Sequence, residues 1–233
     1  MRPDFTRRAL GVERMDDGGA AGWDLERALR ELGWINRFLG GWRTSCKALG
    51  QLAPSRGEWS LLDVGTGGGD IPQAVVRWAR RRGQRVRVVA LDFNPHVCRW
   101  AARETAGWDE IRLVQADVAA LPFAPGSFDV VHCGMFLHHF PQERAADILG
   151  WLYGLCRRGM VVNDLHRHPV AYYFTRQVLC RWARSPMVRH DAPLSVLRGF
   201  TRQELEELGS LSGIDDYKVL WQWAFRYLFV SKK

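Results

Sequence analysis

Apolar positions in the middle of the chain follow two spacings. Short apolar runs of strand length alternate with segments of about ten to fifteen residues in which apolar positions recur at helical spacing. We expect strands at 59–64, 85–91, 111–115, 127–133 and 159–162, and helices at 71–82, 95–104 and 142–153. Strands joined by helices form βαβ units, so the pattern predicts an α/β fold with a doubly wound, mainly parallel sheet.

The end of the chain departs from this alternation. A helix over 201–211 opens with the capping pair Thr201 and Glu204, and strands at 216–221 and 225–230 are close enough in sequence to form a hairpin. Such a pair gives a mainly parallel sheet an antiparallel last strand. The whole pattern therefore predicts a seven-stranded, Rossmann-like sheet.

The first part of the chain precedes the alternation. Residues 1 to about 20 are polar and rich in glycine, which predicts a mobile tail. Apolar residues at helical spacing over 24–49, interrupted by a pair of glycines, predict two helices that form a lid. We therefore expect a tail and helical lid over 1–57 and a ligand-binding domain over 58–233.

The first strand-to-helix turn carries the glycine-rich sequence DVGTGGGD. Glycines let the backbone turn tightly and let a ligand approach it closely. A dinucleotide-binding GxGxxG loop that began at Gly65 would need glycine where this chain has Asp70. Asp63 and Asp70 would repel a pyrophosphate, whereas they suit a ligand with ammonium and sulfonium groups, such as S-adenosylmethionine.

Residues with matching chemistry stand at the ends of the next strands. Asp92 can accept hydrogen bonds from both hydroxyls of a ribose. Asp117 can accept a bond from an adenine amino group, and Phe93 and Val118 offer apolar faces to the ring. The fourth strand ends at Cys133-Gly134, where the transferred methyl is expected. Asp92 or Asp117 alone would be read as a cap or turn residue, but together these features predict a ligand site.

These motifs resemble those of the class I S-adenosylmethionine-dependent methyltransferases. The similarity covers about residues 59–165, with DVGTGGGD, LDFNP and QADVAALPFAPGSFDVVHCGMFLHHF, and is strongest to the ubiquinone- and menaquinone-biosynthesis subgroup. The resemblance implies that S-adenosylmethionine is the cofactor and that 58–233 is the methyltransferase domain. Its implied contacts are Asp63, Gly65, Gly67 and Gly69, with Thr66 in the same loop, for the methionine half, Asp92 for the ribose, and Asp117 and Val118 for the adenine.

The resemblance also gives an expectation for the acceptor. INRFLGGWR at 35–43, with the segments at 161–173 and 188–201, is similar to a bacterial branch associated with aromatic or polyketide metabolism. We therefore expect O- or C-methylation of a small aromatic, quinone-like or polyketide acceptor in secondary metabolism.

Candidate catalytic residues follow the fourth and fifth strands. Methyl transfer is an in-line displacement, so the protein positions the acceptor and removes its proton where needed. We expect His138 or His139 to be the base, with a slight preference for His139, because both follow the fourth strand. Asp164 and His166 form a reserve pair. A magnesium site of the catechol type would need an acid where Cys133-Gly134 stands, so no metal is predicted.

Charge raises one alternative function. The net charge of +8 raises the question of nucleic-acid binding, so an RNA or other nucleic-acid methyltransferase is the alternative. Methylation of base amino groups typically uses an Asn/Asp-Pro-Pro-aromatic motif after the fourth strand, and CGMF stands there. The densest basic cluster, between Arg77 and Arg87, should lie at the opposite sheet edge. A small molecule is therefore the expected partner.

Other whole-chain features are those of an ordinary globular protein. No run of eighteen apolar residues occurs, and the N-terminus lacks the apolar stretch of a signal peptide, so we expect a cytoplasmic location. The five cysteines form no CxxC pair, which predicts reduced thiols instead of a zinc site or a disulfide framework.

Overall fold

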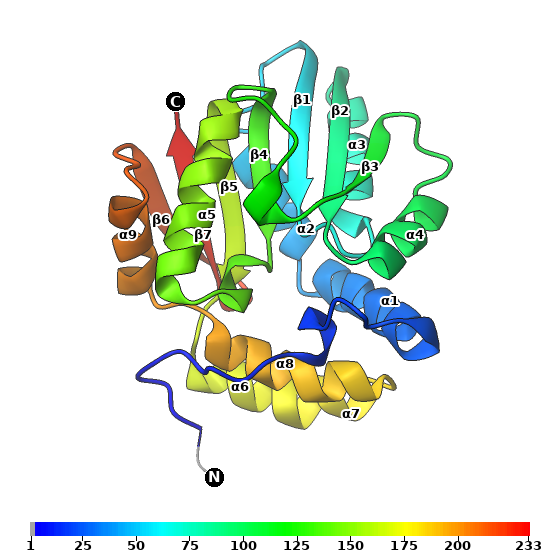
Figure 1. The fold of residues 1–233 in the computed structure, drawn as a ribbon, viewed down its shortest axis with the longest axis vertical. Helices are drawn as coiled ribbons and strands as arrows, with labels where there is room; N and C mark the ends of the chain where they lie inside the picture. Colours follow the sequence, from blue (N-terminus) through cyan, green and yellow to red (C-terminus); the bar gives the residue numbers. More distant parts are fainter. Residues whose placement is uncertain (1–2) are drawn as a thin grey trace.

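A computed structural model describes residues 3–233 and contains a seven-stranded sheet (Figure 1). The strand order is β3-β2-β1-β4-β5-β7-β6; β1 to β5 pair in parallel, and β7 runs antiparallel to both of its neighbours. The predicted doubly wound, mainly parallel sheet with an antiparallel last strand is confirmed. The strands are β1 (Gly57–Val64), β2 (Gln84–Asp92), β3 (Ile111–Gln115), β4 (Phe128–Gly134), β5 (Cys156–Leu165), β6 (Tyr217–Gln222) and β7 (Arg226–Lys232).

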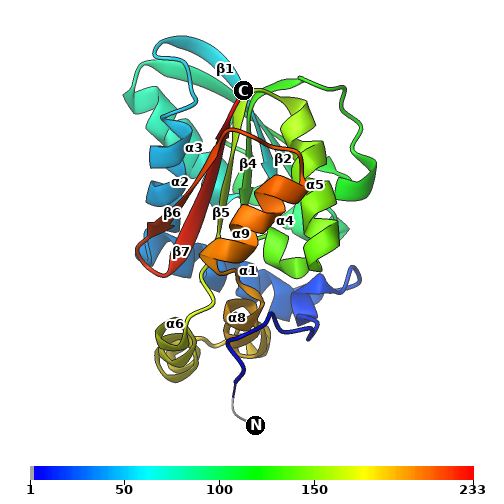
Figure 2. The same cartoon turned by 90° about the vertical axis from the view of Figure 1, so that its left-hand side faces the viewer.

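Helices cover both faces of the sheet. Figure 2 shows α2 and α3 on one face and α5 and α9 on the other. Successive strand side chains point to opposite faces, so Leu61 packs with α2 and α3 while its neighbour Leu62 packs with α5 and α9. The α-helices are α1 (Gly22–Phe38), α2 (Gly41–Leu49), α3 (Asp70–Arg81), α4 (Pro95–Glu104), α5 (Gln142–Leu155), α6 (Pro169–Phe174), α7 (Cys180–Trp182), α8 (Pro186–Arg198) and α9 (Arg202–Leu211).

Local sequence signals set several of these boundaries. The Asn94 side chain accepts hydrogen bonds from the first backbone N–H groups of α4, and Pro95 fits the first helical position. Thr201 and Glu204 form the predicted capping box at α9. Gly40 adopts φ 72°, in the left-handed region, and separates α1 from α2.

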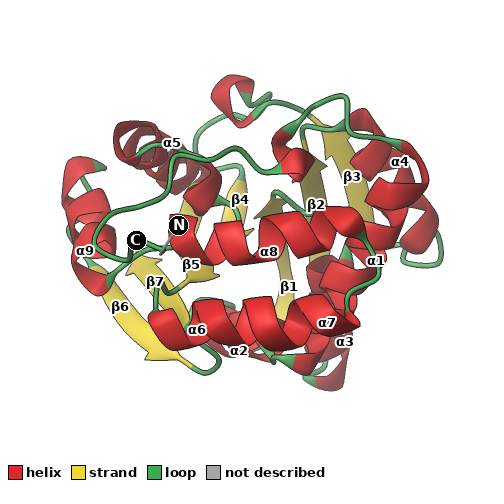
Figure 3. Cartoon of the chain, turned by 90° about the horizontal axis from the view of Figure 1, so that it is seen from below, coloured by secondary structure: helices red, strands yellow, loops and turns green. Residues whose placement is uncertain are grey.

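The carboxyl ends of the strands are covered by a layer of helices. Seen from that end, α1, α6, α7 and α8 lie across the sheet (Figure 3). The strand order reverses at β1, which pairs with both β2 and β4, and such a reversal opens a crevice at the carboxyl ends of these strands. Within residues 3–233, no helix has both the length and the apolar character needed to cross a bilayer.

The N-terminal segment, predicted to be a mobile tail, is bound to the rest of the protein over residues 8–18. Residues 8–18, which we call the strap, run along α8 and line the cavity described below (Figure 1, dark blue). The Ala9 N–H donates to Leu197 O at 3.1 Å, and the N–H groups of Arg14 and Met15 donate to the Asp191 carboxylate at 2.9 and 3.0 Å. The part of the predicted mobile tail over residues 8–18 is therefore bound to the rest of the protein, in part through backbone groups that leave no periodic pattern in the sequence. Residues 1 and 2 lie outside the described residues.

Candidate active site

A cavity of about 1130 Å³ lies at the carboxyl ends of β1, β2 and β4. Its walls come from the strap, α1, α8, the glycine-rich loop and the loop after β4. Pockets for one small molecule usually measure roughly 300–1,000 Å³, so this cavity has room for a cofactor and an acceptor together.

The glycine-rich loop forms one wall and needs its glycines. Gly65, Gly67 and Gly69 have φ values of 67°, 53° and 78°, a region that side chains disfavour. A Cβ on Gly65 would lie 2.4 Å from the Phe136 ring. Gly65, Thr66 and Gly67 line the cavity, while Gly69 lies behind the loop, where its Cβ would approach Thr105. The loop therefore presents backbone to a ligand.

Asp92 faces the cavity from the end of β2. One carboxylate oxygen accepts a hydrogen bond from the Gly67 N–H at 3.1 Å and the other accepts from the Asn94 N–H at 3.0 Å. Burial raises the pKa of Asp92, although these backbone donors oppose the shift. Each oxygen keeps lone-pair capacity beyond its one backbone bond, which fits two ribose hydroxyls.

The expected adenine contacts lie beside Asp92. Phe93 is 57% exposed and packs against Gly18 of the strap, whose Cβ would lie 2.7 Å from the ring. The Asp117 side chain accepts from the Ala119 N–H at 2.8 Å, and so caps a short 3-10 helix at Val118–Ala120. Phe93, Asp117 and Val118 all line the cavity, so the apolar and polar partners predicted for adenine are brought together.

Asp63 supports the loop from within. Its two oxygens bond the Thr66 hydroxyl at 2.7 Å and His132 Nδ1 at 2.6 Å, and His132 Nε2 lies 2.8 Å from Ser45 Oγ. Asp63 is buried at the cavity wall, and each of its oxygens keeps lone-pair capacity beyond its one protein bond. Asp63 therefore supports the loop, and its predicted contact with the methionine half of the cofactor stays a prediction.

The two residues at the end of β4 point in different directions. Cys133 is fully buried in the core between the sheet and α5, and burial raises the pKa of its thiol far above the ordinary value. Gly134 lines the cavity, where a Cβ would lie 2.8 Å from the His132 ring. Gly134 alone of this pair can face a ligand.

His138 and Asp164 form a buried pair. His138 Nδ1 lies 2.6 Å from a carboxylate oxygen of Asp164, and the His138 backbone N–H donates to the other oxygen at 3.3 Å. Although burial favours a higher value, the charge and hydrogen bond of His138 hold the pKa of Asp164 below its usual range. Asp164 lies behind the cavity wall, and His138 is the member of the pair that lines it.

His139 is the more open of the two histidines. Its side chain is 21% exposed, and its Nδ1 lies 2.5 Å from Asp16 in the strap. Asp16 also pairs with Arg198 at 2.6 Å. Burial works against ionisation of Asp16, yet His139 and Arg198 lower its pKa to about 2. Asp16 is therefore shared between His139 and Arg198.

Two arginines fix the loop that carries the histidines. Arg8 of the strap donates to the carbonyl oxygens of His138 and Phe140, both at 2.9 Å. Arg198 of α8 donates to the carbonyl oxygens of His138 at 3.1 Å and His139 at 2.5 Å. These bonds join the strap and α8 to the loop, so the position of the imidazoles depends on both segments.

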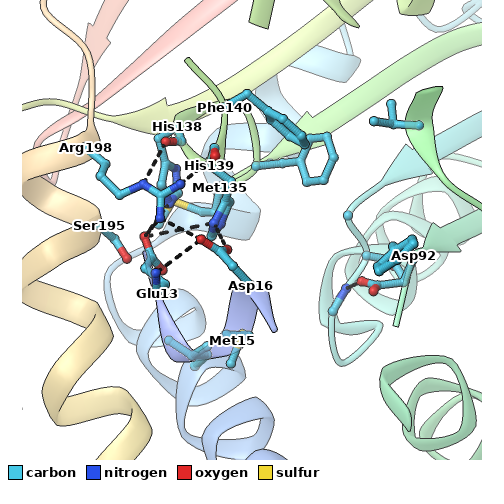
Figure 4. Close-up of a pocket in the computed structure, with 18 of the residues that line it drawn as sticks. Glu13, Met15, Asp16, Asp92, Met135, His138, His139, Phe140, Ser195 and Arg198 are labelled. Atoms are coloured by element: carbon cyan, nitrogen blue, oxygen red, sulfur yellow. Dashed lines mark hydrogen bonds and ion pairs between the residues drawn. The ribbon is translucent and has the colours of Figure 1, made fainter. Parts of the chain in front are cut away.

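Glu13, which the sequence did not single out, lies beside His138 and His139. It is 4% exposed, and among residues 3–233 its Oε1 has no hydrogen-bond partner but lies 3.7 Å from His138 Nε2 and 4.0 Å from His139 Nδ1 (Figure 4). The side chains of Glu13, His138 and His139 lie close enough together to hold a metal ion. The Arg198 guanidinium, however, lies 3.6 Å from Glu13 Oε1 and already supplies a positive charge there. The absence of a metal stays a prediction.

Glu13 should make stability depend on pH. Burial raises its pKa from 4.5 to about 7, against the opposing charges of His139 and Arg198. The folded state therefore holds this proton more tightly than the unfolded state, and stability should fall as pH rises from about 4.5 to about 7. Glu13→Gln removes that ionisation, so its melting temperature relative to wild type should increase between about pH 5 and about pH 8. Thermal melts at both pH values test this.

The matched control is Glu104→Gln, an exposed glutamate at the end of α4. Its melting temperature should stay parallel to that of the wild type over the same pH range. A Glu13→Gln variant that also stays parallel would contradict the assignment of a buried, proton-holding carboxyl.

His166 lies away from the cavity. Its Nδ1 accepts a hydrogen bond from Trp221 Nε1 at 3.3 Å, and its ring packs on Tyr227 with centroids 4.7 Å apart. Burial and the neighbouring His168 and Arg167 charges lower its pKa to about 4. The residues that line the cavity include neither His166 nor Asp164, so neither member of the predicted reserve pair is part of the cavity wall.

Comparisons with known proteins agree with this arrangement. Residues 61–159 match the family model described as "Methyltransferase domain". The chain is 33% identical to a demethylmenaquinone methyltransferase of Roseiflexus castenholzii, over 62% of this chain and 56% of that protein. It is 32% identical to the demethylmenaquinone methyltransferase of Roseiflexus sp. (strain RS-1), over 76% of this chain and 72% of that protein. For several curated relatives the chain spans about half of their length.

Solved structures show the same fold. Human N-acetylserotonin methyltransferase in complex with S-adenosylmethionine superposes with a TM-score of 0.64 over 90% of this chain and 55% of that one. The sequence identity of 16% makes this a likeness of fold.

Proposed function

The chain belongs to the class I S-adenosylmethionine-dependent methyltransferases, and we propose that it transfers a methyl group to a small aromatic, quinone-like or polyketide acceptor. The observation that carries the proposal is one cavity with two chemically different ends. Asp92 and the glycine-rich loop lie at one end, and the histidine loop lies across from them (Figure 4). The acceptor class rests on the resemblance and on the quinone-biosynthesis relatives.

The residues present fit S-adenosylmethionine. The backbone of Gly65 to Gly67 would hold the methionine half, Asp92 would bind the ribose, and Phe93, Asp117 and Val118 would contact the adenine. When bound, this cofactor supplies an electrophilic methyl group. The protein contributes orientation and the exclusion of water by the strap, α1 and α8.

We assign the base to His138 in preference to His139. When His138 Nδ1–H donates to Asp164, the Nε2 lone pair remains to accept a proton from the acceptor. Asp164 then stabilises the imidazolium with a buried charge that forms no ion pair with an arginine of residues 3–233, whereas Asp16 divides its charge between His139 and Arg198. The geometry thus supports the member of the pair that the sequence did not prefer.

The position of the basic cluster argues against a nucleic-acid substrate. Its arginines lie at the end of α3 and the start of β2, whereas Asp92 and the cavity lie at the other end of β2. Several of them have partners there: Arg80 bonds Glu110 at 2.8 Å through two nitrogens, and Arg82 lies over the Trp78 ring. The cluster therefore reads as a solvated helix end.

Reversing the cluster should leave methyl transfer nearly unchanged. We expect the triple variant Arg80→Glu, Arg81→Glu and Arg82→Glu to retain small-molecule turnover within a few-fold, because the changed charges are screened by solvent at the far end of the strands. Turnover and melting temperature are measured together, since loss of the Arg80–Glu110 bond lowers stability a little. A folded variant without activity would favour the nucleic-acid alternative.

The proposed function is tested by a screen for methyl transfer. Labelled S-adenosylmethionine is incubated with the protein and a panel of phenols, quinols and polyketide aromatics, beside structured and unstructured RNA. We expect label in at least one small aromatic and none in RNA. Label in RNA alone would overturn the acceptor class, and calorimetric binding of NAD in place of the methyl donor would overturn the proposal as a whole.

A further inference from the structure

Arg226 is a buried guanidinium in the wall of the cavity. It begins β7, is 3% exposed and lines the cavity together with Asn36 of α1 and Met135 after β4. Its hydrogen-bond partners within residues 3–233 are the Met135 sulfur at 3.0 Å and the Asn36 side-chain oxygen at 3.4 Å, and its Nε has none. Neither partner carries a negative charge, although a guanidinium offers five N–H donors.

Burying a guanidinium without a paired anion lowers the stability of the ligand-free protein. A buried charge loses its hydration, and only a paired anion with good hydrogen bonds offsets the loss. Burial accordingly lowers the pKa of Arg226, while Asp164 and Asp70 oppose the shift. Asn36 lies between Arg226 and Asp70: its oxygen accepts from Arg226, and its Nδ2 donates to the Asp70 carboxylate at 2.8 Å. The neutral amide bridges the two charges without neutralising the guanidinium.

Met135, which contacts Arg226 through its sulfur, has a strained backbone conformation. It has φ 54°, in the left-handed region that residues other than glycine rarely adopt. Strained backbone of this kind persists where the surrounding structure requires it, and it is common at ligand sites. Met135 directly follows the strand end where the transferred methyl is expected. The strain and the unpaired cation therefore occur at one place in the cavity wall.

We propose that Arg226 binds a carboxylate within the cavity. The planar guanidinium matches a carboxylate with two parallel hydrogen bonds, which neither Met135 nor Asn36 can provide. This inference rests on the proposed function only in that the cavity takes a donor and an acceptor. Two carboxylates are candidates for this site: the one at the methionine end of the donor, and one on the acceptor. The place of Arg226 on β7, across β4 and β5 from the glycine-rich loop on β1, favours the acceptor.

Two binding measurements distinguish these sources without relying on turnover. In the donor arm, calorimetry compares S-adenosylmethionine with decarboxylated S-adenosylmethionine. In the acceptor arm, the protein is saturated with S-adenosylhomocysteine and titrated with benzoate and with benzamide. Each arm uses the wild type, Arg226→Met, Arg226→Lys and the control Lys218→Met, which removes an exposed cation from the neighbouring strand β6.

We expect the wild type to prefer the carboxylate ligand at least about tenfold in one arm, the scale of a charge-assisted hydrogen bond. Arg226→Met should abolish that preference, Arg226→Lys should keep part of it, and Lys218→Met should keep all of it. The ligand-free Arg226→Met protein should melt at the wild-type temperature or above, because a buried unpaired charge has been removed.

The proposal would be overturned if, in both arms, the wild type bound the carboxylate ligand no more tightly than the ligand without the carboxylate. A preference for the carboxylate that survives in Arg226→Met would also overturn it. If Arg226→Met does not fold, the wild-type comparison and Arg226→Lys still decide. If the protein binds no donor but binds benzoate through Arg226, the proposed methyl transfer fails and the carboxylate site stands.

Discussion

His138→Ala is expected to lower kcat by about 10²–10⁴-fold at saturating donor, the usual cost of losing a general base. The imidazole lines the cavity with Nδ1 committed to Asp164, so Nε2 is the proton acceptor that the variant removes. The measurement is steady-state methyl transfer to an acceptor found in the screen. Donor affinity is determined separately by calorimetry, so that a loss of binding is not counted as a loss of chemistry.

Companion variants separate the two histidines. Asp164→Asn should lose much of the same rate while donor affinity holds, because the change acts on the orientation and charge of His138. His139→Ala, a neighbouring ring paired with Asp16, should lose less. Near-normal turnover in both histidine variants would place the base elsewhere. Loss of donor binding in His138→Ala would assign that residue to the cofactor shell.

The fold could be predicted wherever local signals agree with the apolar pattern. The helix at Pro95–Glu104 and the strand at Ile111–Gln115 were predicted with their observed bounds, because a cap, a proline and clear periodicity coincide there. The strand predicted at 159–162 extends over Cys156–Leu165. Its polar end is buried: Asn163 Nδ2 donates to Ser45, and Asp164 pairs with His138. Such partners cannot be seen in the sequence.

The segment between β5 and α9 shows what the pattern leaves out. It folds into α6, a π-helical turn at Thr175–Leu179, α7 and α8, none of which the sequence predicted. Pro193 stands inside α8, and that helix buries polar Asp191 and Arg198 together with Val188 and Val196. A helix that contacts the strap on one side and the loop after β4 on another has no single apolar stripe.

Some residues of the site could be predicted from the sequence and others could not. Residues at strand ends, such as Asp92 and His138, could be singled out because parallel strands end at one edge of the sheet. Glu13 and Arg226 could not, since one lies in a segment without periodicity and the other in a strand whose side chains alternate between faces. Each has one buried polar atom, Glu13 Oε1 or Arg226 Nε, with no hydrogen-bond partner within residues 3–233, and such burial depends on segments far apart in the sequence.

Asp92→Ala is expected to weaken donor binding by about 1.5–3 kcal/mol, the scale of hydrogen bonds to a charged group. That corresponds to roughly a ten- to 150-fold rise in Kd. The carboxylate already bonds the N–H groups of Gly67 and Asn94, so it is held in place with one lone pair on each oxygen directed to a ligand. Calorimetry with S-adenosylmethionine and S-adenosylhomocysteine measures the change, and NAD serves as the control ligand that should not bind.

The variant also loosens the glycine-rich loop, so affinity alone does not identify the contact. A ligand comparison does: the wild type should bind S-adenosylhomocysteine more tightly than its 2′-deoxy analogue, and Asp92→Ala should bind the two nearly equally, because the partner of the 2′-hydroxyl is gone. Asp92→Asn keeps an acceptor for the Gly67 N–H and should fall between wild type and Asp92→Ala. If Asp92→Ala still discriminates against the deoxy ligand as the wild type does, Asp92 only holds the loop, and another group must bind the ribose.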